Sequence, residues 1–421
     1  MKAVVVGSGL IGITSAYFLA NRGWEVTVVD RRDGPGQETS FANGALLTPS
    51  MPEPWNAPGS WRVLLRSLGR TDSPLLLRVR AVPGLSGWGL GFLRNSSPAR
   101  YERNTRRNSA LALYSLAALQ ALRRDTGIEY GQAQVGTLRV FREAAALERA
   151  VESAERLRDA GLVFRALTRD EVVALEPALA PIARRLAGGI HYPNDETGNA
   201  HTFCRNLAEL ARRAGVEFQF ETMASEIEVR ARRVMAVICK GKRLTADRYV
   251  VAAGSYTPEL LADVGIAIPV RPVKGYSVTF DRHSEDPPLR IPVVDDGFHA
   301  VVVPIDNGIR VAGTAEFAGY DLSLPDGRIG NLFTLLGQIL PQAEFDRTAA
   351  RFWCGLRPMS ADGVPIIGPT PIENLWVNTG HGPLGWTMAV GSGRLLTDLM
   401  AGESVDVDAR AYALARFYGT P

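Results

Sequence analysis

The first thirty residues constrain the fold more than any other stretch of the chain. Residues 2–6, KAVVV, form a short β-branched run that is typical of a buried parallel strand. The loop GSGLIG follows at residues 7–12, a helical pattern covers residues 13–21, and a second strand pattern at residues 25–29 ends in Asp30. Strand, glycine loop, helix, strand and terminal acid in this order indicate a nucleotide-binding α/β unit rather than an isolated glycine-rich turn.

The glycines of this loop have separate physical roles in a dinucleotide fold. Gly7 permits the tight turn out of the strand, Gly9 lets the backbone approach a pyrophosphate, and Gly12 lets the helix pack closely on the sheet. The free N–H groups at the start of the helix stabilise the anion. Asp30 lies 18 residues beyond Gly12, where a carboxylate accepts hydrogen bonds from an adenosine ribose. These residues predict a dinucleotide site without saying which dinucleotide binds.

Length and composition narrow the class of protein. The 421 residues are enough for two interleaved domains, and a formal net charge of +3 gives no reason to expect nucleic acid. The three cysteines are isolated and the five histidines are scattered, so we expect neither disulfides nor a metal site. Glycines interrupt the apolar N-terminus, which argues against a signal peptide. No apolar run reaches the roughly 18 residues of a spanning helix, and we expect a cytoplasmic protein or one attached peripherally to the inner face of the membrane.

Two more turns of small residues follow predicted strands. The strand at residues 248–252 leads into Ala253-Gly254-Ser255, and the strand at 374–378 precedes a glycine-rich stretch at 380–386 and a final helix at 387–400. The carboxyl ends of strands in an open parallel sheet form the ligand crevice, so three such turns would line one long, flat cofactor. The N-terminus of the final helix has two interpretations: it could stabilise negative charge on a reduced flavin, or it could be an ordinary glycine-rich start of a helix.

Arg357 is the strongest candidate for contact with a substrate. It lies in WCGLRPM among apolar and small residues, and a buried guanidinium needs an anion, either a substrate carboxylate or a structural partner. Tyr276 could add a hydroxyl to the same anion, or it is a half-buried strand tyrosine. His381 is the one histidine inside a candidate site, and we do not expect it to act as a general base.

The rest of the chain predicts a second domain. Residues 268–315 alternate in the manner of antiparallel strands, and residues 109–126, 143–160, 201–214 and 328–340 have helical patterns. We expect a Rossmann-like nucleotide domain built from residues 1–50, 186–265 and 341–421, with an antiparallel substrate domain at 51–185 and 266–340. Residues 51–98 mix tryptophans, leucines and arginines, which suits either contact with an anionic membrane or, as we favour, helices packed on the substrate domain.

Several stretches together resemble one family of flavoproteins. They are VVVGSGLIGITSAYFLA, ETSFANGALLTP, PWNAPG, VGTLRVF, YPNDETGNA, VKGYS, WCGLRPMSADGVPIIG and NTGHGPLGWTMAVGSG, and they run nearly from end to end. In these the chain resembles the small-subunit type of D-amino acid dehydrogenase, within the D-amino acid oxidase/glycine oxidase superfamily. The fold that this resemblance implies is glycine-oxidase-like, with a discontinuous Rossmann-like domain and an antiparallel-sheet domain.

The resemblance implies FAD as the cofactor. It implies a role at the substrate for Arg357, Tyr276 and His381, of which Arg357 would bind the carboxylate. The residues implied at the cofactor are Gly7, Ser8, Gly9, Leu10, Ile11, Gly12, Asp30, Arg31, Thr39, Ser40, Asn43, Gly44, Ala45, Leu46, Ala224, Ala253, Gly254, Gly355, His381, Gly382, Leu384, Gly385, Trp386 and Thr387.

The activity implied is oxidative deamination of a D-amino acid, with electrons passed to a quinone or another respiratory-chain acceptor. Three alternatives stay open: a dehydrogenase of D-proline or hydroxy-D-proline, an oxidase that uses oxygen, and a non-catalytic FAD-binding subunit. One residue departs from the glycine oxidases, because Pro383 occupies a loop where those enzymes carry an arginine.

Overall fold

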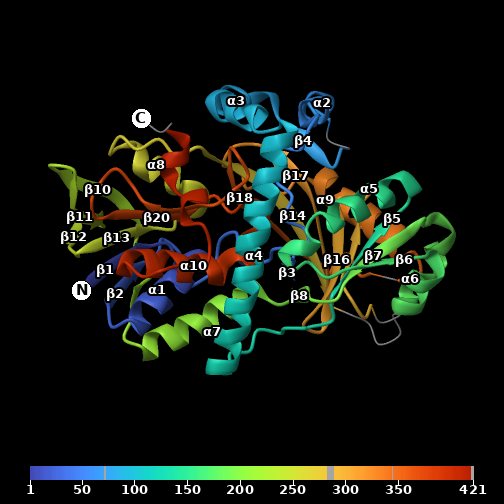
Figure 1. Ribbon diagram of the computed structural model, residues 1–421, viewed down its shortest axis with the longest axis horizontal. Coiled ribbons are helices and arrows are strands. Elements are labelled where there is room, and N and C mark those ends of the chain that lie inside the picture. The colour runs from blue at the N-terminus through green and yellow to red at the C-terminus, as the bar shows by residue number, and fades with distance from the viewer. Residues whose placement is uncertain (71–72, 282–288, 344, 419–421) are drawn as a thin grey trace.

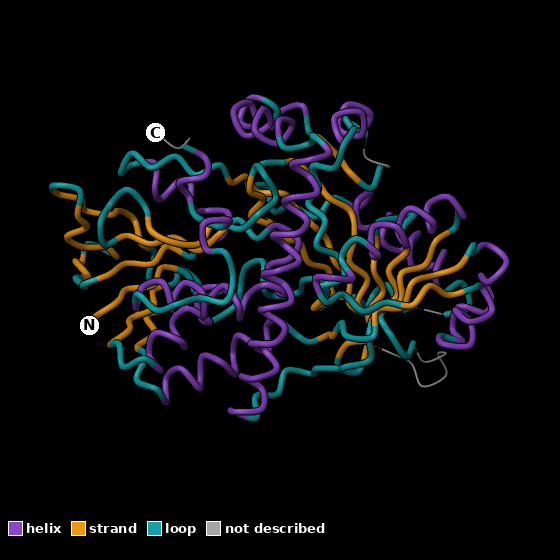
Figure 2. The backbone as a smooth tube through the Cα atoms, viewed as in Figure 1, coloured by secondary structure: helices purple, strands orange, loops and turns teal. Residues whose placement is uncertain are grey.

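A parallel sheet and a larger, mostly antiparallel sheet lie on either side of the long helix α4 (Figure 1). The computed structural model describes residues 1–70, 73–281, 289–343 and 345–418. Parts of the predicted domain ranges, at residues 71–72, 282–288, 344 and 419–421, fall outside the described residues. Figure 2 shows the strands gathered in these two halves, with helices packed over them.

The parallel sheet has the strand order β19-β20-β13-β1-β2-β9, in which only the edge strand β19 is antiparallel to its neighbour among the described residues. Its strands are β1 (Lys2–Val6), β2 (Glu25–Val29), β9 (Glu217–Gln219), β13 (Arg248–Val251), β19 (Ile366–Pro369) and β20 (Leu375–Thr379). The valines of β1 and β2 are buried between helices on one face and a small sheet on the other. The small sheet consists of β10 (Ala224–Arg230), β11 (Arg233–Cys239) and β12 (Lys242–Leu244). The sequence prediction of a discontinuous Rossmann-like unit is confirmed.

The larger sheet has the order β18-β14-β17-β16-β15-β5-β7-β6, and β4 pairs with β17 beside this path. Its strands are β4 (Leu75–Leu77), β5 (Thr137–Phe141), β6 (Arg165–Leu167), β7 (Gly188–Tyr192), β14 (Val270–Asp281), β15 (Val293–Asp295), β16 (Ala300–Ile305), β17 (Gly308–Phe317) and β18 (Arg351–Ser360). The pair β3 (Leu46–Leu47) and β8 (Glu196–Thr197) lies apart from it. By strand pairing, β7 and β18 belong to this sheet although they lie within ranges predicted for the nucleotide domain, and the domain division itself stays a prediction.

The helices cover the faces of both sheets. They are α1 (Leu10–Asn21), α2 (Ser60–Arg66), α3 (Ser86–Arg94), α4 (Pro98–Thr126), α5 (Ala144–Glu155), α6 (Arg169–Leu175), α7 (Ala200–Arg213), α8 (Thr257–Ala262), α9 (Asp326–Ile339) and α10 (Gly385–Ala401). None of the helices in the described part of the chain has the length and apolarity that crossing a bilayer requires.

Helix α4 begins eleven residues before the start that the sequence predicts, with Pro98 in its first turn. The added turns are polar but buried, since Asn104 donates to the Asp362 carbonyl at 3.0 Å and Asn108 donates to the Pro52 and Gly363 carbonyls at 2.9 Å. These bonds fasten α4 to segments that lie far away in the sequence. The predicted start at residue 109 is therefore wrong, because the apolar periodicity from which a helix is predicted does not detect buried polar contacts of this kind.

Candidate active site

A cavity of about 960 Å³ opens where three glycine-containing turns meet. The turns follow β1, β13 and β20, which are neighbours in the parallel sheet. Their carboxyl ends therefore lie at one edge, as predicted for the ligand crevice of an open α/β sheet. From there the cavity runs past the loop at residues 39–46 to Arg357 and on to β5 and α5 in the other half of the molecule.

Close backbone packing explains two of the glycines in the first turn. Gly7 has a φ of +106°, and a Cβ there would lie 2.6 Å from the Ala252 carbonyl oxygen. A Cβ on Gly12 would lie 1.8 Å from the Gly7 carbonyl oxygen, so any side chain would push α1 away from the end of β1. Gly9 caps α1 without a side-chain bond. The start of α1 therefore remains next to the cavity, where its N–H groups suit a pyrophosphate.

Asp30 lines the cavity at the end of β2. Its carboxylate accepts hydrogen bonds from the Ser8 backbone N–H at 2.6 Å, the Ser8 hydroxyl at 2.7 Å and the Arg32 N–H at 2.8 Å. Arg31 pairs with Glu38 and stacks over the ring of Tyr256, with its Cζ 3.8 Å from the ring centroid. This end of the cavity combines a glycine turn with a carboxylate, as adenosine binding requires.

The loop at residues 39–46 lines the middle of the cavity and is held from three sides. The Thr39 hydroxyl donates to the Leu356 carbonyl at 2.8 Å, the Ser40 hydroxyl accepts the Leu10 N–H at 3.2 Å, and Asn43 Oδ1 accepts the Ala45 N–H at 3.0 Å. Arg310 donates to the Asn43 carbonyl at 3.1 Å. The loop is thus tied to α1, β18 and β17 rather than lying free on the surface.

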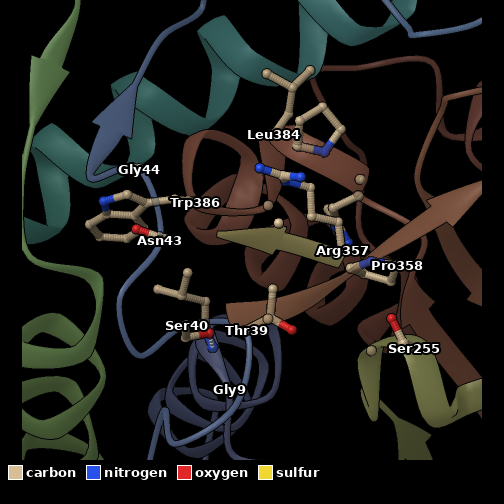
Figure 3. A pocket seen from close by; sticks show the side chains of 18 of the residues that line it. Gly9, Thr39, Ser40, Asn43, Gly44, Ser255, Arg357, Pro358, Leu384 and Trp386 are labelled. Carbon is tan, nitrogen blue, oxygen red and sulfur yellow. Dashed lines mark hydrogen bonds between the residues drawn. The ribbon is translucent and has the colours of Figure 1, made fainter. Parts of the chain in front are cut away.

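The entry to α10 closes the cavity from the opposite side. Figure 3 shows Leu384 and Trp386 from this entry, Thr39, Ser40, Asn43 and Gly44 from the loop, and Arg357 from β18 around one space. The Trp386 indole donates to the Gly198 carbonyl at 3.1 Å, which fixes the orientation of its ring.

Arg357 carries its charge into the cavity without a carboxylate partner among the described residues. Its guanidinium lies across Gly275, where a Cβ would stand 2.3 Å from Cζ, so the glycine makes room for it. Its one hydrogen bond to a described residue is long, from Nη1 to the Thr314 carbonyl at 3.4 Å. The ring centroid of Trp55 is 5.4 Å from Cζ. Burial lowers the pKa of Arg357 to about 10, so the group is still a cation at neutral pH. A guanidinium that faces a cavity without a carboxylate partner among the described residues has the charge and the donors that suit an anion.

Tyr276 lines the cavity, but its hydroxyl is not at Arg357. Adjacent strand residues point to opposite faces, and Gly275 faces Arg357. The Tyr276 hydroxyl donates to Glu316 in a buried group that includes Arg78 and Arg328. Burial and Glu316 raise the pKa of Tyr276, so it is a neutral hydrogen-bond donor. The Tyr276 hydroxyl, which the sequence predicts to assist Arg357, therefore binds Glu316 on the opposite face of the strand.

His381 is buried beside the turn that leads into α10 and lines the cavity. Its Nε2 is 2.9 Å from the Ser392 hydroxyl, while its buried Nδ1 has no partner among the described residues. Burial lowers the pKa of His381 to about 3, so the imidazole is neutral at physiological pH. A neutral ring with one unpartnered nitrogen suits a hydrogen bond to a bound group better than proton transfer near neutrality.

Most of the predicted residues come together at the cavity. Those that line it are Gly7, Gly9, Leu10, Ile11, Asp30, Arg31, Thr39, Ser40, Asn43, Gly44, Ala45, Leu46, Ala224, Ala253, Gly254, Tyr276, Gly355, Arg357, His381, Gly382, Leu384, Gly385 and Trp386. Three others lie behind the wall and support it: Ser8 binds Asp30, Gly12 packs on Gly7, and the Thr387 hydroxyl accepts the Thr48 N–H at 3.0 Å.

Sequence analysis missed the residues at the far end of the cavity. Glu53, Trp55, Tyr101 and Arg139 line this end and come from a loop, α4 and β5. Trp55 belongs to the stretch PWNAPG, but the sequence analysis interprets residues 51–98 only as a membrane contact or as helices packed on the substrate domain. No local spacing connects these four positions, so only the fold shows that they share a cavity.

The glycine turns, the carboxylate at the end of β2, the unpartnered His381 Nδ1 and the long cavity fit an extended flavin dinucleotide. The family model described as FAD dependent oxidoreductase matches residues 2–399. The chain belongs to this family of FAD-dependent oxidoreductases, and FAD is its cofactor.

Curated relatives match over the whole chain. A protein named D-amino acid dehydrogenase from Paramagnetospirillum magneticum is 44% identical over 99% of both chains. One of the same name from Xanthobacter autotrophicus is 43% identical over 99% of both chains. Glycine oxidase from Geobacillus kaustophilus has the same fold, with a TM-score of 0.78, 24% identity and 99% coverage of both chains. L-proline dehydrogenase from P. horikoshii has a TM-score of 0.79 at 17% identity, covering 99% of this chain and 97% of its own.

Proposed function

We propose that this enzyme oxidatively deaminates D-amino acids and passes the electrons to an acceptor of the respiratory chain. The observation that carries the proposal is the Arg357 guanidinium, which faces the cavity between the loop at 39–46 and the start of α10. No carboxylate in the described part of the chain pairs with this cation. An α-carboxylate is the anion that matches its fork of donors. The relatives at 43% and 44% identity carry the name of this activity.

The residues of this chain bind and orient the substrate more than they transfer protons. Arg357 holds the carboxylate, and the stacked Trp55 limits how the guanidinium can turn. His381 stays neutral, so it adds no charge beside the reacting carbon. Bound FAD supplies the two-electron acceptor that converts the amine to an imine, which water hydrolyses to a 2-oxo acid and ammonia.

We assign the cofactor contacts to the cavity-lining residues of the predicted set. Gly7, Gly9 and the start of α1 hold the pyrophosphate, Asp30 and Arg31 the adenosine, and the loop at 39–46 with the start of α10 the flavin. The division into a nucleotide domain at 1–50, 186–265 and 341–421 and a substrate domain at 51–185 and 266–340 is part of this proposal.

The test is anaerobic bleaching of the flavin spectrum by a panel of D-amino acids, L-amino acids, glycine, D-proline and hydroxy-D-proline. We expect D-amino acids to bleach the flavin and their L-isomers to leave it oxidised. Bleaching by cyclic imino acids alone would favour the alternative D-proline dehydrogenase. If no member of the panel bleaches the flavin, oxidation of D-amino acids and oxidation of D-proline are both contradicted. The remaining alternative is then a non-catalytic FAD-binding subunit.

Air and a quinone analogue then distinguish an oxidase from a dehydrogenase. We expect reduced enzyme to transfer electrons to the quinone analogue much faster than to oxygen, with little peroxide formed. Stoichiometric peroxide in air would identify an oxidase and contradict the respiratory acceptor.

The surface of α2, α3 and the turns between them, which we call the α2–α3 surface, has features that support contact with a membrane. A membrane would carry the proposed respiratory-chain acceptor. Both helices pack through Leu64, Trp88 and Phe92 on the same apolar cluster, and they lie at one rim of the molecule (Figure 1). This inward packing agrees with the interpretation favoured from the sequence. Large apolar side chains are nevertheless exposed on the outside, namely Trp61, Val63, Leu65, Leu68, Val79, Val82, Leu90 and Leu93.

Exposed arginines border this surface, among them Arg62, Arg66 and Arg94. Exposed leucines and a tryptophan beside arginines match the interface of an anionic bilayer. We therefore propose peripheral attachment through the α2–α3 surface. Sedimentation with vesicles of phosphatidylglycerol and phosphatidylcholine is expected to recover the enzyme, and less of a Leu65→Gln/Leu90→Gln variant. Equal recovery of both proteins would contradict the attachment.

A further inference from the structure

The cavity continues beyond Arg357 into an arm that the proposed cofactor contacts leave unused. Glu53 and Trp55, Tyr101 of α4, Arg139 of β5 and Ser153 of α5 line this arm. Glu53 and Trp55 also border a small second cavity together with Gly382 and Leu384, next to the entry to α10. The arm therefore begins at the site of the α-carboxylate and leads away from the nucleotide.

Most charges around the arm are already paired. Arg139 donates to Asp296 through Nε at 3.1 Å and through Nη2 at 2.5 Å. Arg142 donates to Asp295 through Nε at 3.0 Å and through Nη2 at 2.8 Å. Arg149 is exposed on α5, where water screens its charge.

Glu53 is the exception. It is half-buried, and no basic nitrogen of a described residue donates a hydrogen bond to it. The guanidinium of Arg139 lies near enough for the charges of Glu53 and Asp296 to raise its pKa against the effect of burial, but the side-chain N–H groups of Arg139 donate to Asp296. For Glu53, the one hydrogen bond from a described residue is long: Oε1 accepts it from the Ser153 hydroxyl at 3.3 Å. Burial raises the pKa of Tyr101, the negative charge of Glu53 raises it further and the positive charge of Arg139 lowers it, so both charges act on the ring that lines the arm.

Within the described part of the chain, the cavity thus holds a cation without a carboxylate partner at Arg357 and a carboxylate without a charged hydrogen-bond donor at Glu53. The nearby Arg139 shares its single positive charge between Asp296 and Glu53, so the group of these three residues keeps a net negative charge. A substrate whose α-carboxylate lies on Arg357 can direct its side chain into the arm. A half-buried carboxylate with a single long bond stabilises a cation that donates hydrogen bonds and repels an acid. An apolar side chain is not stabilised by this carboxylate, because such a side chain offers it no hydrogen bond and leaves it poorly solvated.

We propose that Glu53 determines side-chain specificity and makes the enzyme favour D-amino acids with an ammonium or guanidinium side chain over neutral and acidic ones. This inference rests on the proposed deamination of D-amino acids. It concerns the far side of the substrate, away from the carboxylate and from the reacting carbon.

The test compares kcat/KM of the holoenzyme and of Glu53→Gln for D-lysine, D-arginine, D-norleucine and D-glutamate, with a dye as electron acceptor. Loss of a charge-assisted hydrogen bond is expected to lower kcat/KM for the two cationic substrates by roughly 10- to 100-fold. D-Norleucine is expected to be unaffected and D-glutamate to improve. Glu53→Asp keeps the charge and is expected to keep the order of preference. Glu148→Gln is the matched control, since Glu148 is exposed on α5 and does not line the cavity.

Three results would overturn the inference while leaving the proposed function intact. One is a wild-type enzyme that oxidises D-norleucine but discriminates against D-lysine and D-arginine. Another is an equal fall for all four substrates in Glu53→Gln, which would mean that Glu53 binds the α-amino group common to them. The third is an unchanged order of preference in that variant. If instead none of the D-amino acids reduces the flavin, the proposed function itself fails and this inference fails with it.

Discussion

The two ends of the cavity are built in opposite ways. The nucleotide end is made of backbone, in turns at the ends of neighbouring strands where glycine leaves no side chain in the way. The far end is made of charged and aromatic side chains from a loop, α4, β5, α5 and β18. Close backbone packing tolerates almost no change, whereas a side-chain pocket can be altered one group at a time. We expect the first end to control whether the cofactor binds and the second to control which substrate is used.

The largest effect should come from Gly12→Ala. A Cβ 1.8 Å from the Gly7 carbonyl oxygen forces α1 away from β1, which destroys the turn at the pyrophosphate. We expect a protein without flavin absorbance, or one that does not fold. Gly87→Ala on α3 is the control, because nothing lies within 4 Å of a Cβ there. A yellow, active Gly12→Ala protein would contradict the distinction between the two ends.

Arg357→Ala should change substrate binding and leave the flavin in place. Removing the guanidinium should raise KM for D-amino acids on the order of 100-fold, since two charge-assisted hydrogen bonds are lost. Steady-state kinetics and the flavin spectrum of the purified variant test this. Arg351→Ala, on the same strand but in an exposed pair with Asp281, should behave as wild type. Loss of flavin from Arg357→Ala would show that the residue has a structural role instead.

Tyr276→Phe should affect stability rather than substrate binding. The variant deprives the buried Glu316 of one donor, which should cost about 1–3 kcal/mol of unfolding free energy in urea. Tyr418→Phe, which removes a hydroxyl from an exposed ring, should cost less. A rise in KM comparable to that of Arg357→Ala would place the Tyr276 hydroxyl at the substrate after all.

At neutral pH the smallest effect should appear in His381→Gln, where the substitution shows itself as a change in the pH dependence of stability. The pKa of His381 is about 3 in the folded protein against an ordinary 6.5, so between these values the unfolded chain binds a proton that the folded chain does not. The unfolding free energy should therefore fall as the pH falls through this window, by at most about 1.4 kcal/mol per pH unit from this group.

Glutamine at position 381 does not titrate, so the variant should show a shallower fall than the wild type. Urea unfolding of both holoenzymes at several values between pH 4.5 and 7 measures the difference. Burial raises the pKa of Asp195 to about 7, and this contribution is common to both proteins and cancels in the comparison. Parallel stability curves would contradict a neutral, buried His381.

The nucleotide end could be predicted closely from the sequence. The predicted strands at 2–6 and 25–29 match β1 and β2 residue for residue, and the turns after β1, β13 and β20 meet as expected. These features are local, because alternation of strand and helix, a glycine loop and a terminal acid lie within thirty residues. Arg357 could also be singled out, because an arginine among small and apolar residues needs an anion, and the structure places it at the cavity. Its role at the substrate stays a prediction.

Tertiary structure alone decided the rest. Gly275 makes room for the guanidinium of Arg357, and Trp55 stacks on it from a loop some 300 residues away in the sequence. The Tyr276 hydroxyl donates to Glu316, on the other face of β14 from Gly275 and Arg357. The contact of α5 with the loop at Glu53 forms the arm of the cavity. The loop at residues 7–12 depends on the backbone conformation of residues that are neighbours in the sequence. Such constraints select particular residue types at fixed spacings, so they can be recognised in the sequence. The substrate pocket depends on contacts between distant side chains, which no local pattern records.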